Sequence, residues 1–320
     1  MIAFKWLLMR EFWEHKGAFF WTPVVIGTIM VLLTALSVLF GVLGLSDGIQ
    51  INGMKVNSLA QIITPEQKAA SATALVLIYI GILLPFSIAF AFAVFFFCTG
   101  ALYDERKDRS VLFWKSLPLS DRATVLSKVV MAIGIAPLIA LVISTVAAIL
   151  AGLLTCLAAT AAGVNIFTDV LSNPSTYLAP FQVVAMLPIY ALWALPTIGW
   201  LLMVSAWARS KPFLWAVGVP LMAGVLVSWA SRAFQFDLNT TWLWKNIIGR
   251  LLVSVLPGSW LGSHAAMFQG EVNRRATSAL GDLLTQSWQS LASANIWIGA
   301  ALGAAMIYAA IRLRGGRDEG

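Results

Sequence analysis

Charged side chains concentrate in Tyr103–Lys128, a stretch that lies between two of the most hydrophobic runs in the chain. A polar segment between two apolar runs is typical of a loop outside the bilayer, and an excess of Lys and Arg predicts that this loop is cytoplasmic. The chemistry open to these residues is recognition of a cytoplasmic partner, with an ordinary solvated connection as the alternative. The basic residues are Arg106, Lys107, Arg109, Lys115, Arg122 and Lys128, and the acidic residues are Asp104, Glu105, Asp108 and Asp121.

The middle of this loop has the pattern of a short helix followed by a second helix. Residues 109–117 would form about two helical turns that present Phe113 and Trp114. Pro118 disfavours helix at the residue before it, so the first helix should end there. Ser120 can then cap a second helix that has an acidic residue in its first turn, and this helix would continue into the next membrane span. We interpret the first helix as an exposed aromatic surface that a partner can bind.

Catalytic chemistry is not indicated, because the expected membrane spans contain no Asp, Glu, Lys, Arg or His. Ion-coupled transporters use ionisable groups at membrane depth, and intramembrane hydrolases need a catalytic dyad or a metal cluster. His15 and His264 are far apart in the sequence and are expected to be interfacial residues rather than metal ligands. The chain also lacks the G-x-x-x-x-G-K-[ST] pattern of a P-loop. We therefore expect no enzyme, no cofactor and no metal in this chain, and energy for uphill transport would come from another polypeptide.

Composition predicts an all-α integral membrane protein with a single domain, residues 1–320. Of the 320 residues, 60% are hydrophobic and 11% are charged, whereas about 25% are charged in a typical soluble domain. The formal charge of +7 is small for nucleic-acid binding, and basic residues at membrane edges explain it better. Cys98 and Cys156 lie in apolar runs and are expected to pack there rather than to form a disulfide or bind a metal.

Six spanning helices are expected after an amphipathic helix at residues 1–18 that lies on the membrane. On this first helix a polar arc contains Arg10, Glu11, Glu14 and His15, and the opposite arc contains Trp6, Met9, Phe12 and Trp13. The expected spans are residues 19–45, 74–102, 129–163, 181–207, 213–231 and 295–311. Most of them contain a proline, and we expect static kinks at these positions. Gly299 and Gly303 form a G-x-x-x-G pattern that we interpret as local close packing.

Charge predicts the orientation of these spans. The segments 1–18, 102–128, 208–212 and 312–320 contain 14 of the 21 Lys and Arg residues, and all of them lie on one side if there are six spans. Both termini are therefore expected in the cytoplasm, and the chain is expected to be a multi-pass protein of the inner (plasma) membrane.

The last external loop, residues 232–294, contains a moderately apolar segment at residues 246–267. A seventh full span there would move the C-terminal arginines to the outside, against the charge distribution. We therefore expect either a re-entrant helix pair that turns at Pro257-Gly258 or helices that lie on the outer surface, and the sequence leaves these two alternatives open.

The cytoplasmic loop resembles a known signature. Its residues Glu105-Arg106, Arg109-Ser110, Leu117-Pro118-Leu119-Ser120 and Lys128 resemble the E-R … [ST] … L-P-[VL]-S … K pattern of ABC-2-type transporter permeases. The six-span layout, the amphipathic first helix and the long last external loop are also similar to that family. One departure is Arg109, because many members of the family have Gly at that position.

The resemblance implies the transmembrane permease subunit of an ATP-driven exporter. Two permeases, as a homodimer or a heterodimer, would assemble with two cytoplasmic ABC ATPase subunits that bind ATP and Mg²⁺. The first helix would lean on the ATPase, the external loop would re-enter the membrane as a lid, and substrate would cross between the two permeases. Membrane lipid is a further expected partner, and nucleic acid is not. The loop 102–128 would be the ATPase-coupling loop, with Glu105, Arg106, Arg109, Phe113, Trp114, Leu117, Pro118 and Ser120 as its coupling residues.

Two other functions stay open at this point. One is a secondary transporter or channel, which the charge-free spans disfavour. The other is a membrane anchor or sensor subunit that recruits a cytoplasmic partner through the same loop.

Overall fold

The computed structural model describes residues 2–46, 49–51, 54–56, 71–108, 120–236, 239–263 and 276–316. Helices make up almost all of this part of the chain, and six of them are long and apolar enough to cross a membrane, so the predicted all-α membrane fold is confirmed. A small antiparallel hairpin between the first two long helices is the exception within the described residues. It consists of β1 (Ile49–Ile51) and β2 (Met54–Val56).

The six long helical segments follow the predicted spans closely. They are α2 (Thr22–Ser46) with a preceding π-helical turn (Gly17–Trp21), α4 (Ser71–Gly100), α7 (Asp121–Val130) continued through a π-helical turn (Met131–Ile135) into α8 (Ala136–Ala161), α11 (Leu187–Trp207), α12 (Pro212–Ala233) and α17 (Ala294–Gly316).

Shorter helices precede or connect them. They are α1 (Ile2–Glu14), α5 (Tyr103–Lys107), α9 (Phe167–Ser172), α10 (Pro174–Ala185), α13 (Thr240–Leu243) continued through a π-helical turn (Trp244–Ile248) into α14 (Gly249–Val253), a 3₁₀ turn (Ser259–Ser263), α16 (Ala276–Gln289) and a second 3₁₀ turn (Ser290–Ala292).

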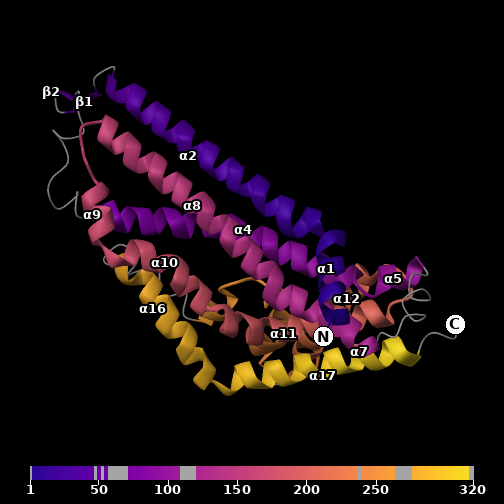
Figure 1. Cartoon of the computed structure of the whole chain (residues 1–320). Helices are drawn as coiled ribbons and strands as arrows, with labels where there is room; N and C mark the ends of the chain where they lie inside the picture. The colour runs from indigo at the N-terminus through magenta and orange to yellow at the C-terminus, as the bar shows by residue number, and fades with distance from the viewer. Residues whose placement is uncertain are drawn as a thin grey trace.

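The long helices form an elongated bundle with two distinct ends (Figure 1). One end, which we call the near end, lies at the right of Figure 1 and contains α1, α5, α7 and the last turn of α17. The opposite end, which we call the far end, contains the β1–β2 hairpin, α9 and α10. The first helix and the last turn of α17 therefore lie at the same end of the bundle.

Two span boundaries differ from the predictions. The third long helix begins at Asp121 rather than at residue 129, because Ser120 caps it and no break separates α7 from α8. The fourth begins at Leu187 rather than at residue 181, because the helix is interrupted at Met186, two residues before Pro188. Proline lacks the N–H that an uninterrupted helix needs at this position.

Close packing of α11 against α17 forms the centre of the bundle. A Cβ atom added at Gly303 would lie 2.5 Å from the backbone carbonyl of Leu195, and one added at Gly199 would meet the backbone of Gly303. Only glycine permits two helices to approach so closely. Local packing of the G-x-x-x-G pattern is confirmed for Gly303, whereas Gly299 packs against Arg250.

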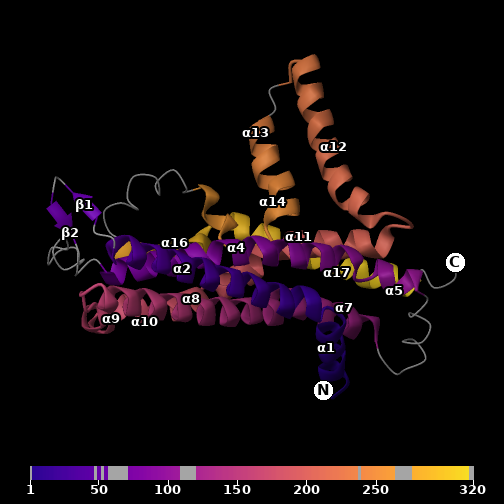
Figure 2. The same cartoon turned by 90° about the horizontal axis from the view of Figure 1, so that it is seen from above.

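α12 and the helix that follows it project from the side of the bundle (Figure 2). The chain turns near residues 234–239 and returns beside α12, where Trp244 and Ile248 pack on Gly224 and the Trp244 indole donates a hydrogen bond to Ser228. The return helix ends at Val253, and the chain turns again through Pro257 and Gly258, whose φ is +84°. No helix long enough to span occurs in the described part of residues 246–267, which ends at Ser263.

Candidate functional site

A buried network of ion pairs lies at the near end of the bundle, with the Glu105 carboxylate at its centre. Glu105 belongs to α5, directly after the second long helix, and only 7% of its surface is exposed. Its Oε2 accepts a hydrogen bond of 2.6 Å from Arg314, and its Oε1 lies 3.0 Å from the ammonium of Lys128. Arg10 also reaches Oε1, at 3.4 Å. One carboxylate therefore holds cations from three other helices.

Further pairs extend the network in both directions. Lys128 also contacts Glu11 at 2.8 Å, and both side chains are fully buried. Arg314 also donates to Asp121 at 3.0 Å, at the start of α7. Among the described residues the network joins three cations to four carboxylates, the fourth being Glu14, which pairs with Arg10.

The first helix contributes to the network through its polar arc. Glu11 is fully buried against the bundle, whereas Trp6 and Trp13 are 63% and 60% exposed. α1 also stands at a steep angle to α2 (Figure 2). The arcs that the sequence predicts are present, and Glu11 of the polar arc faces the protein while Glu14 remains exposed.

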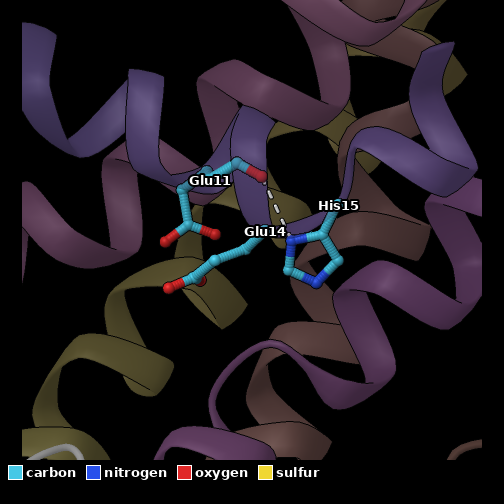
Figure 3. Close-up of side chains that lie close together, drawn as sticks. All are labelled: Glu11, Glu14 and His15. Carbon is cyan, nitrogen blue, oxygen red and sulfur yellow. Dashed lines mark hydrogen bonds between the residues drawn. The ribbon is translucent and has the colours of Figure 1, made fainter.

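Glu11, Glu14 and His15 come together closely enough to be considered as metal ligands (Figure 3). The Nδ1 of His15 donates to the backbone carbonyl of Glu11, which leaves only Nε2 as a possible ligand. The two carboxylates already bind Lys128 and Arg10, and a divalent cation would have to enter beside those charges. Ion pairing therefore accounts for this cluster better than a metal does.

Arg106 fastens the same region to the end of α11. Its guanidinium donates to the backbone carbonyls of Ser205 and Ala208, and the Ser205 hydroxyl accepts from the backbone N–H groups of Leu102 and Tyr103. These bonds satisfy backbone groups where α4 and α11 end. Arg106 therefore links α5 to the end of α11.

Ser120 caps α7 as predicted, because its hydroxyl accepts a hydrogen bond from the Ala123 N–H at 3.2 Å. Asp121 occupies the first turn, and the helix continues into the third span. The proposed coupling helix at 109–117 and its residues Arg109, Phe113, Trp114, Leu117 and Pro118 lie outside the described residues.

Glu105, Arg106 and Ser120 stand out in the sequence of the charged loop, whereas most of the residues that form the ion-pair network with Glu105 do not. From the sequence alone, Glu11 belongs to the polar arc of the first helix, and Arg314 is one of the basic residues of the C-terminal segment. A usable signal is that acidic and basic residues occur together in three segments, 1–18, 102–128 and 312–320, that the six-span layout brings to one side. Which of them pair is decided by helix packing, which periodicity does not reveal.

The buried ion pairs at the near end can hold helices together. Removing one partner from a buried ion pair leaves an uncompensated charge and typically costs about 3–5 kcal/mol. The network therefore holds α1, α5, α7 and α17 together at the level where the charged loop leaves the bundle. Comparison with protein-family models, with curated proteins and with solved structures finds no match.

Proposed function

We propose that this chain is the permease subunit of an ABC exporter, coupled through residues 102–128 to a separate cytoplasmic ATPase subunit. The observation that carries the proposal is that residues of the buried network lie directly before and directly after the charged loop. Glu105 precedes residues 109–119, and Asp121 and Lys128 follow them. Both ends of the loop are therefore tied to α1 and α17 by buried charges.

Buried ion pairs at both ends of the loop would allow the loop to transmit movement to the helices. Movement of the loop would have to carry α1, α7 and α17 with it, because separating the buried pairs is costly. A solvated connection would have no need of buried charges at both of its ends. The absence of a P-loop pattern supports a partner that supplies ATP hydrolysis with Mg²⁺. Two such permeases in the inner membrane, with both termini cytoplasmic, would complete the assembly that the signature implies.

Co-expression with the candidate ATPase tests the proposal. Aromatic anchors at interfaces commonly contribute about 2 kcal/mol each, which is roughly a 30-fold change in affinity. The double variant Phe113→Ala/Trp114→Ala should therefore lose ATPase pull-down and ATP-driven transport while remaining in the membrane. The matched control is Phe234→Ala/Phe236→Ala, which removes two exposed aromatic side chains beyond the end of α12. Wild-type assembly and transport by the first double variant would refute the proposal.

The same experiment separates the two other functions. Transport that continues without the ATPase would favour a secondary transporter or channel. Assembly with the ATPase but no ATP-dependent transport would favour an anchor or sensor.

A further inference from the structure

A large polar cavity lies between the return helix 240–253 and the bundle. It has a volume of about 940 Å³ and is bounded by residues of α11, α14, α16 and α17. Lys245 and Arg250 line it together with serine, asparagine and glutamine side chains, and none of the described residues that line it is Asp or Glu. The cavity is therefore positively charged and rich in hydrogen-bonding groups.

Arg250 is the central cation of this cavity. Its guanidinium stacks on the Trp193 ring at 4.2 Å from the centroid, and its Nη1 donates to the backbone carbonyl of Asn295 at 2.5 Å. The Nε and Nη2 atoms are buried without a hydrogen-bond partner in the described part of the chain, where no carboxylate pairs with Arg250. Burial lowers the pKa of the guanidinium, yet arginine stays protonated at neutral pH.

The Arg250 guanidinium is held in place, because the Trp193 ring and the backbone at Gly299 lie close to it on two sides. A buried charge without a counter-charge is costly, so native proteins usually pair it. The cavity thus presents a fixed positive group with unused donors.

An apolar cavity of about 210 Å³ adjoins the polar one. Trp260 lines both cavities, at the turn that follows the return helix. The walls of the apolar cavity come from α4, α8, α16 and the break between α10 and α11, and include Phe90, Ala140 and Leu283. Its two serine hydroxyls are already bonded to carbonyls of their own helices. A cavity of about 150 Å³ with apolar walls is large enough to bind benzene, so this one can take a short hydrocarbon segment.

We propose that the two cavities together bind an anionic amphiphile, with its carboxylate or phosphate head at Arg250 and its hydrocarbon part in the apolar cavity. A small inorganic anion would leave the apolar cavity unused, and a neutral hydrophobe would leave the guanidinium unpaired. The ligand would be the cargo of the exporter, and to that extent the inference rests on the proposed function. Binding itself does not depend on an ATPase.

The test is equilibrium binding of radiolabelled dodecyl phosphate to the purified full chain in phosphatidylcholine nanodiscs, with binding to empty nanodiscs subtracted. Unlabelled competitors then separate the contribution of the anionic head to binding from that of the hydrocarbon tail. These competitors are dodecanol, dodecyltrimethylammonium and inorganic phosphate. Dodecyl phosphate should compete at least about tenfold better than dodecanol and dodecyltrimethylammonium, because a charge-assisted hydrogen bond contributes about that factor. It should also compete better than inorganic phosphate, which lacks a hydrocarbon part to bury in the apolar cavity. Dodecanoate should compete nearly as well as dodecyl phosphate.

Two variants locate the site. Arg250→Gln should weaken dodecyl phosphate binding about tenfold or more, whereas Arg232→Gln, which removes an exposed cation at the end of α12, should bind like wild type. Ala140→Leu fills the apolar cavity from α8 and should weaken dodecyl phosphate binding while leaving the preference for an anionic head unchanged. Size-exclusion profiles and melting temperatures report whether each variant is folded.

Equal binding by wild type and folded Arg250→Gln would overturn the inference, and so would equal competition by dodecanol and dodecyl phosphate. If Arg250→Gln does not fold, the competitor series on the wild type and the Ala140→Leu variant decide the matter. A failure here leaves ATPase pull-down by the wild type unaffected, so it is distinguishable from a failure of the proposed function.

Discussion

Glu105 shows how one side chain fixes the near end of the molecule. It pairs with Arg10, Lys128 and Arg314, which come from three helices far apart in the sequence. Its carboxylate is nine-tenths buried, so water cannot replace it as a partner for these cations. The role of Glu105 is therefore electrostatic and structural.

Replacing Glu105 with glutamine should destabilise the protein by about 3 kcal/mol, because Lys128 and Arg314 would keep their charge in a buried site. The measurement is the melting temperature in detergent. Asp108→Asn is the matched control, since Asp108 is exposed at the end of the same short helix and should melt like wild type. Equal melting of Glu105→Gln and wild type would contradict the network.

A second residue-scale prediction concerns the Lys128–Glu11 pair. Lys128→Met should destabilise, because it leaves the fully buried Glu11 without its cation. The double variant Lys128→Met/Glu11→Leu should recover part of the lost stability, and comparing the single and double variants measures the coupling. If the two effects simply add, α1 is not held by this pair.

At the element scale, the contact of α11 with α17 depends on glycine. Gly303→Ala would place a methyl group 2.5 Å from the carbonyl of Leu195, so the two helices must separate. We expect destabilisation of about 1–3 kcal/mol, typical of overpacking, measured as a lower melting temperature. Gly218→Ala on α12 meets no atom within 4 Å and is the control. A Gly303→Ala variant that melts like Gly218→Ala would contradict the close contact.

At the scale of the whole molecule, the bundle places both termini at one end and the β1–β2 hairpin at the other (Figure 1). With the charge distribution of the sequence, this predicts that the near end is cytoplasmic. Single cysteines at Lys55 and Asn173 should react with a membrane-impermeant maleimide added to sealed cells, and a cysteine at Lys107 should not. These single cysteines should be introduced into a variant in which Cys98 and Cys156 have been replaced, since both native cysteines are buried free thiols. External labelling at Lys107 would reverse the orientation.

The six long helices, the cap at Ser120 and the close-packing role of Gly303 can all be predicted from the amino-acid sequence. Each of these follows from local composition, from apolar length or from the conformational limits of one residue, so neighbours in the chain are enough to predict it. The helix interruption at Met186 and the inward orientation of Glu11 are visible only in the folded molecule. The tertiary structure also decided which charges pair, and it brought Arg250 beside Trp193 without a carboxylate partner in the described residues. Ion pairs and cavities join side chains up to about two hundred residues apart, and their positions depend on how whole helices pack, which no local pattern in the chain records.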